Sequence, residues 1–137
     1  MLSIILIGVS IPVTKVEAAT KHLIIINTKT NKLGYFVNNK IVKTFPVATG
    51  KASTPTPTWK SKIVNKIKNR PYYSGGIPGG SPRNPLGDRW LELHIRGNYG
   101  TTYGIHGNNN ESSIGKHVSG GCIRMHNSDI RWLFDQI

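Results

Sequence analysis

The sequence predicts a mainly β protein, built as one domain, with a single helix near its C-terminal end. Fifteen glycines and eight prolines among 137 residues indicate many turns. Several short stretches are rich in β-branched residues or alternate apolar with polar side chains, which is the pattern of strands. Helical spacing occurs at Ile130, Leu133, Phe134 and Ile137, which fall at positions i, i+3, i+4 and i+7. A chain of this length builds one modest core.

We expect residues 1–18 to be a signal peptide and residues 19–137 to form the folded domain. An apolar run over residues 2–13 is followed by Val16-Glu17-Ala18-Ala19, whose small residues suit signal peptidase, and we predict cleavage after Ala18. The apolar run is too short for a comfortable membrane span, and an uncleaved membrane anchor is the alternative. The expected location is outside the cytoplasm, as a secreted protein at the extracellular face or cell wall of a bacterium.

Six strands are predicted in the folded domain, the first of them buried and the third half exposed. They cover residues 22–27, 34–37, 41–47, 59–67, 90–95 and 103–106. Polar residues at 28–32 and 38–40 are expected to form turns. The prolines of segment 54–58 exclude a central strand there, because proline lacks the backbone donor. The long stretch 68–88, rich in glycine and proline, is predicted to be a functional or mobile loop.

The C-terminal helix also carries start signals in the sequence. Asn127 or Ser128 can cap its N-terminus, and Asp129 suits the positive end of the helix dipole. The apolar stripe of this helix is expected to pack across the sheet.

The net charge of +12 at pH 7 points to polyanionic partners. Loss of residues 1–18 leaves this charge unchanged, because it removes one lysine, Lys15, and one glutamate, Glu17. No nucleic acid is expected as a partner, because the basic residues are scattered without an aromatic stacking pattern or a known motif. For an exported protein, anionic cell-wall polymers are the expected partner. Solubility with nonspecific adhesion is the plain alternative.

Cys122 is the chain's only cysteine, so it cannot form an internal disulfide. The preceding Gly120 and Gly121 allow a tight turn and let a substrate approach backbone N–H groups that could hold an oxyanion. His106 lies upstream and completes the minimal set for a cysteine nucleophile, and His106 and Arg124 could both lower the thiol pKa. The alternative is that Cys122 is a small buried side chain.

A zinc site is a third interpretation of the same region. His106, His117, Cys122 and His126 could supply ligands. Their spacing matches no common zinc pattern, and the glycine-rich segment around Cys122 looks like a turn. The sequence therefore predicts neither a metal nor a cofactor.

Two neighbouring segments carry a specific pattern. The first is Tyr-Gly-Ile-His-Gly at 103–107, and the second is Ser-Gly-Gly-Cys-Ile-Arg-Met at 119–125, followed by Asn-Ser-Asp at 127–129. Together they resemble the signature of the L,D-transpeptidase catalytic domain, the YkuD-like family. Segments 45–51, 54–56 and 86–90 also resemble parts of that family. The resemblance runs from about Leu23 to Phe134.

The resemblance implies a β-sandwich-like fold and a cysteine acyltransferase that acts on peptidoglycan. Cys122 would attack the carbonyl between the third residue and the D-Ala of a stem tetrapeptide, release D-Ala and form a thioester. A side-chain amine of a second stem would resolve the thioester and give a 3→3 cross-link. His106 would be the general base and acid, oriented by the carbonyl of Gly107. The remaining site residues, expected to bind substrate or to support the thiolate, are Arg124, Ser119, Gly121 and Tyr103.

The sequence departs from the family pattern in two places. Position 120 is glycine where the family more often has a basic residue. Family domains usually continue into a further strand after the helix, so we expect the chain as given to stop before a last strand. A monomer is expected. The alternative functions are an L,D-carboxypeptidase, in which water resolves the thioester, and a noncatalytic cell-wall-binding domain.

Overall fold

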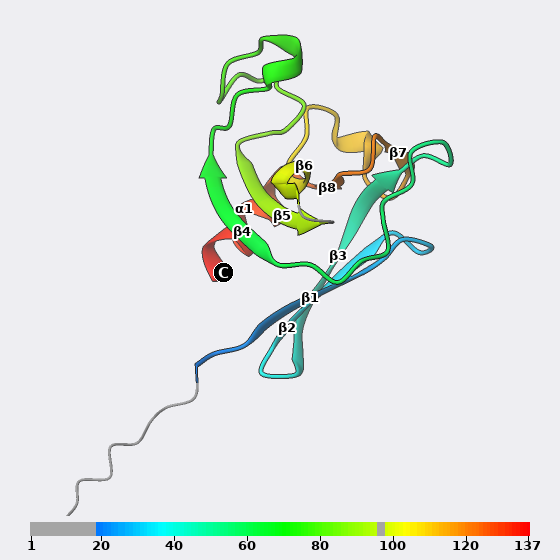
Figure 1. Cartoon of the computed structure of the whole chain (residues 1–137), viewed down its shortest axis with the longest axis vertical. Helices are drawn as coiled ribbons and strands as arrows, with labels where there is room; N and C mark the ends of the chain where they lie inside the picture. The colour runs from blue at the N-terminus through cyan, green and yellow to red at the C-terminus, as the bar shows by residue number, and fades with distance from the viewer. Residues whose placement is uncertain (1–18, 96–97) are drawn as a thin grey trace, which may run out of the picture.

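Eight strands and one α-helix make up the part of the chain that the computed structural model describes, residues 19–95 and 98–137 (Figure 1). The predicted signal peptide lies outside the described residues. The strands are β1 (His22–Asn27), β2 (Lys32–Val37), β3 (Lys40–Gly50), β4 (Ile63–Lys68), β5 (Arg89–Ile95), β6 (Asn98–His106), β7 (His117–Ser119) and β8 (Ile123–Met125). The helix is α1 (Asn127–Gln136), and two short 3-10 turns, η1 (Tyr73–Gly75) and η2 (Glu111–Ser113), complete the set.

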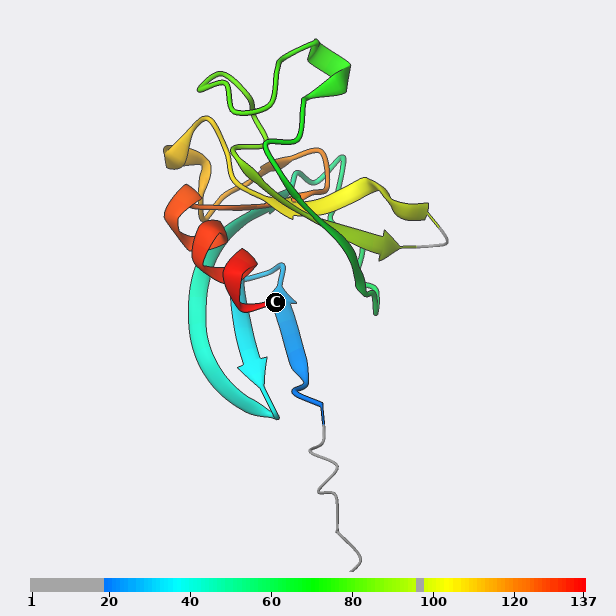
Figure 2. The ribbon, with the colours of Figure 1, turned by 90° about the vertical axis from the view of Figure 1, so that its left-hand side faces the viewer.

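The strands form one curled sheet in the order β1-β2-β3-β8-β6-β5-β4, with β7 paired to the end of β3. Most neighbours are antiparallel, but β8 runs parallel to β6 and antiparallel to β3. Figure 2 shows the β1–β2 hairpin and the first half of β3 at one end of the molecule, and the long connection between β4 and β5 at the other. The predicted mainly β fold with one C-terminal helix is confirmed.

The hairpin between β2 and β3 closes through two consecutive asparagines. Asn38 and Asn39 have φ values of 49° and 68°, in the left-handed region that asparagine tolerates better than most residues. Two central residues with positive φ match the right-handed twist of the flanking strands. The predicted turn at 38–40 is confirmed.

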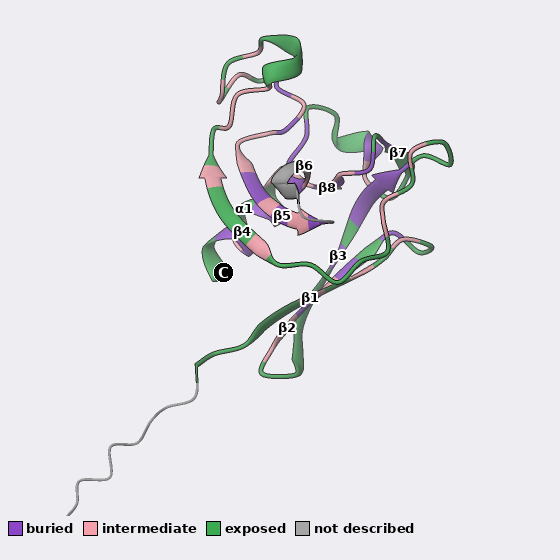
Figure 3. Cartoon of the chain, in the orientation of Figure 1, coloured by how far each residue is buried: buried purple, intermediate pink, exposed green. Residues whose placement is uncertain are grey.

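Several predicted strand boundaries and burial patterns are wrong. The first strand, β1, lies at the edge of the sheet, and its Leu23 and Ile25 are exposed rather than buried. The first half of β3 is exposed on both faces (Figure 3). The fourth strand begins at Ile63 instead of Trp59, and two short strands that were not predicted, β7 and β8, flank the turn before Cys122, which was predicted. Alternation in the sequence does not reveal which strands lie at an edge.

The core lies between the concave side of the sheet and α1. Ile130, Leu133 and Phe134 of α1 are buried, as their spacing predicted, against residues of β2, β3, β5, β6 and β8. The predicted caps are wrong, because His126 occupies the N-cap position without a side-chain hydrogen bond. Instead, Oε1 of Glu111 in η2 accepts a hydrogen bond from the backbone N–H of Asn127 at 3.1 Å. A distant carboxylate thus satisfies one of the unpaired donors at the helix start.

Substitution Leu133→Ala is expected to lower the free energy of unfolding by about 2–5 kcal/mol, because the side chain is fully buried and its removal leaves a cavity. Chemical denaturation monitored by circular dichroism measures this loss. Asp135→Ala on the exposed side of the same helix is the control and should change stability by less than about 0.5 kcal/mol. Equal losses for the two variants would contradict the packing described for α1.

A cavity of about 570 Å³ opens between β1 and the β4–β5 side of the sheet. Apolar residues of both sides line it, among them Ile24, Ile63, Ile105 and Ile123. Neither His106 nor Cys122 is among the described residues that line this cavity. No α-helix in the described ranges is long and apolar enough to cross a membrane.

Candidate active site

The pairing of β6 with β8 brings the two segments of the predicted signature together. Ile105 is paired with Ile123 and His106 with Arg124. Because side chains alternate along a strand, Gly104 and His106 face the same side of β6, while Ile105 faces the core. The Gly104 backbone is hydrogen-bonded to Cys122. The thiol therefore lies beside β6, next to Gly104 and two residues along that strand from His106, and the charges of Arg124 and Arg70 act on both groups.

The imidazole of His106 is buried and neutral near pH 7. Its Nδ1–H donates a hydrogen bond to the Gly107 carbonyl at 2.6 Å, a tautomer assigned from the acceptor, since a carbonyl cannot donate. This leaves Nε2 as the basic nitrogen. The pKa of His106 is lowered to about 4, chiefly by burial; the bond to Gly107 acts against this, and the charges of Arg124 and Arg70 add to it.

Burial also raises the pKa of the Cys122 thiol above its usual value. The Gly104 hydrogen bond and the positive charges of Arg124 and Arg70 act in the opposite direction but are smaller than the effect of burial. Arg124 lowers the thiol pKa, as the sequence predicted. The expectation that His106 also lowers the thiol pKa is wrong for the resting site, because a neutral imidazole carries no charge. The resting pair is a thiol beside a neutral histidine.

Ser119 and Tyr103 shape the turn that precedes Cys122. Buried Ser119 donates its hydroxyl proton to the Cys122 carbonyl at 2.6 Å and accepts the Gly121 N–H at 3.1 Å. Gly121 has a φ of 124°, and a Cβ at this position would lie 2.8 Å from Cε1 of the Tyr103 ring. The Tyr103 ring therefore packs so closely against position 121 that only glycine fits there. The Gly121 N–H is therefore engaged within the turn, with the Ser119 hydroxyl oxygen as its acceptor.

Two threonines hold the same turn from outside, and the sequence analysis did not assign them a role. Thr54 donates to the Ser119 carbonyl and Thr56 to the Gly121 carbonyl, each at 2.8 Å. Thr56 also accepts the Gly50 N–H at 2.9 Å. Because C=O and N–H of a trans peptide point in opposite directions, the bond to the Gly121 carbonyl turns the N–H of Cys122 away from Thr56. The available signal was the family-like Thr-Pro-Thr segment.

Two stacked side chains, those of Trp90 and Arg70, cover His106, and the sequence did not predict them. The Trp90 ring lies parallel to the imidazole, with ring centroids 5.2 Å apart and an interplanar angle of 17°. The Arg70 guanidinium lies 4.5 Å above the Trp90 ring. Gly104 leaves room for this ring, since a Cβ there would lie 2.6 Å from it. The stack brings Arg70, from the predicted long loop, within electrostatic reach of the site.

The remaining histidines of the zinc alternative lie elsewhere. Nε2 of His117 is 2.6 Å from the Thr28 carbonyl, and Nδ1 of His126 is 2.5 Å from Oε2 of Glu111. Among the described residues, no group of three or more histidine, cysteine, aspartate or glutamate side chains is placed to hold a metal ion. The residues proposed as zinc ligands do not converge.

Substitution Arg124→Gln is expected to raise the pKa of the Cys122 thiol, because it removes a positive charge that lowers it. Alkylation by iodoacetamide should then slow roughly threefold at pH 7, with the rate profile displaced to higher pH. Arg131→Gln, which removes an exposed ion pair with Asp88, is the control and should leave the profile unchanged. An unshifted profile in Arg124→Gln would contradict the electrostatic role of Arg124.

Fold and site define the class of the protein, a mainly β domain with a neutral histidine at the end of β6 and a cysteine directly before the neighbouring strand β8. A model of the L,D-transpeptidase catalytic domain matches residues 21–137, and the chain therefore belongs to that family.

Named relatives agree with this assignment. The chain is 46% identical over 114 residues to Bacillus subtilis L,D-transpeptidase YqjB, covering 83% of this chain and 65% of that protein. It is 33% identical over 132 residues to Escherichia coli L,D-transpeptidase ErfK/SrfK, covering 83% of this chain and 40% of that protein. An L,D-transpeptidase structure from Mycobacterium tuberculosis has the same fold, with a TM-score of 0.68 at 16% identity, over 86% of this chain and 54% of that one. The chain thus spans less than two thirds of each relative's length.

Proposed function

We propose that this domain is a cysteine L,D-transpeptidase that acts on the stem tetrapeptides of peptidoglycan. The observation that carries the proposal is the position of Cys122 beside β6, hydrogen-bonded to the Gly104 backbone two residues before His106 and directly before the strand that pairs with His106. The basic Nε2 of His106 is available because Nδ1–H is held by Gly107. Membership of the family supports the same activity.

In the acylation step, the Cys122 sulfur would attack the carbonyl carbon of the third stem residue while His106 Nε2 takes the thiol proton. The tetrahedral intermediate would collapse with cleavage of the peptide bond, and His106 would return the proton to the amine of the departing D-Ala. A thioester on Cys122 remains. A neutral imidazole is the form that can accept the proton, which agrees with the low pKa of His106.

In the second step, the side-chain amine of another stem would attack the thioester and release the thiol, giving a 3→3 cross-link. His106 would take a proton from the attacking amine and restore it to sulfur. Arg124 and Arg70, whose charges favour the thiolate, would support the negative charge that develops on sulfur during both steps.

The test is the reaction of the purified chain with imipenem, followed by intact mass. Imipenem is chosen as the probe because one solved L,D-transpeptidase of similar fold is described in complex with imipenem and another with a faropenem-derived adduct. We expect a mass increase of one imipenem on the wild type and none on Cys122→Ala. A folded wild-type protein that stays unmodified would overturn the proposal and favour a noncatalytic wall-binding domain.

Tetrapeptide muropeptides then separate the two enzymatic outcomes. Cross-linked dimers with loss of D-Ala are expected for the transpeptidase. Free tripeptide without dimers would identify the L,D-carboxypeptidase, which uses the same thioester with water as acceptor.

We also propose that the protein works outside the cytoplasm, at the bacterial cell wall, where its charge of +12 favours contact with anionic wall polymers. Cosedimentation with purified cell walls at increasing salt tests this contact. Binding should weaken as salt rises, because screening reduces the attraction between exposed charges. Binding that does not depend on salt would contradict an electrostatic contact.

A further inference from the structure

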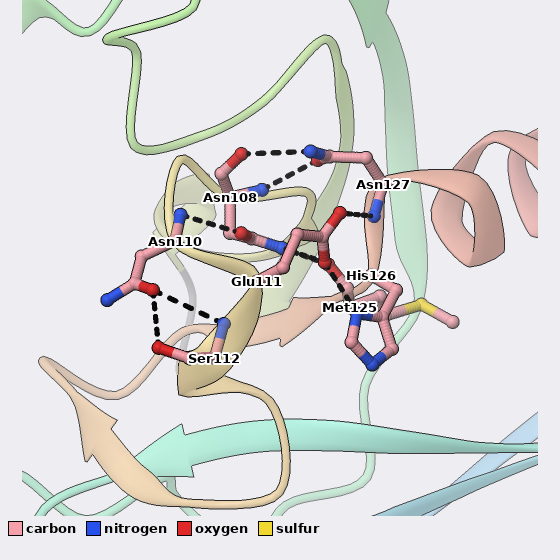
Figure 4. A network of polar contacts seen from close by, with 7 residues as sticks. All are labelled: Asn108, Asn110, Glu111, Ser112, Met125, His126 and Asn127. Atoms are coloured by element: carbon pink, nitrogen blue, oxygen red, sulfur yellow. Dashed lines mark hydrogen bonds and ion pairs between the residues drawn. The ribbon is translucent and has the colours of Figure 1, made fainter.

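The peptide unit that joins Gly107 to Asn108 is hydrogen-bonded on both sides. Its carbonyl accepts the Nδ1–H of His106 at 2.6 Å. Its N–H, on Asn108, donates to Oδ1 of Asn127 at 2.9 Å (Figure 4). A trans peptide is planar, with C=O and N–H in opposite directions, so the bond to Asn127 fixes the direction in which the Gly107 carbonyl points.

The amide of Asn127 is itself held in one orientation. Its Nδ2 donates to the Asn108 carbonyl at 3.1 Å, which leaves Oδ1 for the Asn108 N–H (Figure 4). Two glycines make room for this oxygen. A Cβ on Gly107 would lie 2.3 Å from Oδ1 of Asn127, and a Cβ on Gly87 would lie 2.7 Å from it. The backbone at Gly107 and Gly87 therefore packs closely against Oδ1 of Asn127.

We propose that Asn127 is a positioning residue for His106, acting through the Gly107–Asn108 peptide. This inference rests on the proposed function, in which His106 is the base. The amide oxygen of Asn127 both orients this peptide and polarises it, since a peptide whose N–H donates a hydrogen bond has a more strongly accepting carbonyl. The carbonyl then stabilises the imidazolium that forms when Cys122 loses its proton.

Such support is needed because the surroundings of His106 disfavour its charged form. The Trp90 ring covers one face of the imidazole. Burial and the charges of Arg70 and Arg124 lower the pKa of His106, and the bond from Nδ1 to Gly107 acts against them. In the described part of the chain, no carboxylate contributes to the shift in the pKa of His106. The peptide and Asn127 together take the place that a carboxylate has in many triads.

Three variants separate this role from a purely structural one. Asn127→Leu removes both hydrogen bonds at nearly constant size. Asn127→Asp keeps the acceptor for the Asn108 N–H and removes the donor. Glu111→Gln is the control, because Glu111 accepts hydrogen bonds from the Asn127 N–H, the His126 ring and the Asn108 side-chain amide, and none of these bonds involves the C=O or N–H of the Gly107–Asn108 peptide. Two readouts apply to each: the rate of imipenem acylation from pH 5 to 9, and the NMR shift of the His106 Nδ1 proton.

We expect Asn127→Leu to be acylated about tenfold more slowly per folded molecule, because the hydrogen bond from the Asn108 N–H to Asn127 is lost and the Gly107 carbonyl becomes a weaker acceptor. The NMR signal of the His106 Nδ1 proton should move upfield for the same reason. Asn127→Asp should retain the rate within about threefold and move the proton downfield, since a carboxylate is the stronger acceptor. Glu111→Gln should keep the wild-type rate and proton shift even where its stability falls.

A wild-type rate and proton shift in folded Asn127→Leu would overturn the inference. If Asn127→Leu does not fold, Asn127→Asp decides, and an unchanged Nδ1 proton there would overturn it equally. Failure of the proposed function looks different: the wild type itself would not be acylated, and the proton shifts would still report whether Asn127 acts on His106.

Discussion

Substitution His106→Gln is expected to slow imipenem acylation of Cys122 by about 10²–10⁴-fold, the usual contribution of a positioned general base. The resting thiol has a raised pKa, so it depends on a neighbouring base to become the nucleophile. Glutamine keeps much of the size of histidine but cannot take a proton. The measurement is the rate of adduct formation by intact mass at pH 7, with circular dichroism to establish folding. A decrease in the acylation rate of less than tenfold in a folded variant would show that His106 is not the general base.

The same variant should change the acid stability of the protein. The pKa of His106 is about 4 in the folded chain against 6.5 for an unperturbed histidine. As pH falls from about 6.5 to 4, the unfolded chain binds this proton first, so the wild type loses stability, by ~3 kcal/mol over the window. His106→Gln lacks this contribution and should show a flatter dependence between these pH values. Urea denaturation at pH 7, 5.5 and 4 measures the difference; parallel curves for the two proteins would contradict the lowered pKa.

Substitution Gly121→Ala is expected to cost at least about 2 kcal/mol of stability and to reduce acylation more than tenfold. Alanine is strained at a φ of 124°, and its Cβ would lie 2.8 Å from the ring of Tyr103. Tyr103 packs against the core and cannot swing freely away. Relief of the clash must therefore move the turn that carries Cys122, and small displacements of a nucleophile are costly in rate.

The neighbouring glycine supplies the control for this prediction. A Cβ on exposed Gly120 meets no atom within 4 Å. Gly120→Ala should therefore leave both the unfolding free energy and the acylation rate close to those of the wild type. Comparable losses at the two positions would show that the sequence Gly-Gly matters for backbone freedom in general, and not for the contact with Tyr103.

Much of the fold could be predicted from the residues alone. The α1 stripe at Ile130, Leu133 and Phe134 and the Asn38-Asn39 hairpin follow from local patterns, and both are confirmed. The burial of β1 could not be predicted, because Leu23 and Ile25 are as apolar as core residues and only the sheet order places them at an edge. The cap of α1 was missed for a similar reason, since its acceptor, Glu111, comes from another element.

In the site, too, some residues could be predicted from the sequence and others could not. Cys122, His106 and Gly107 stand out in the sequence, and the structure brings their two segments side by side through the pairing of β6 with β8. Arg70, Trp90 and Asn127 carry no local signal for their contacts, which arise from strand pairing and from a loop that folds back over the sheet. A motif identifies the groups that react, whereas the groups that hold them are visible only in three dimensions.

The position of β8 has a consequence for how the protein comes into being. This strand of three residues is inserted between β3 and β6, and it has a parallel partner in β6. Parallel pairing of distant segments forms slowly, because the chain must close a loop before any contact rewards it. Since β3 and β6 both precede β8 in the sequence, the pairings that position Cys122 can form only once residues 123–125 lie between these two strands. Before those pairings form, the thiol lacks the burial and the neighbouring charges that shift its pKa, so we expect it to react as an ordinary cysteine.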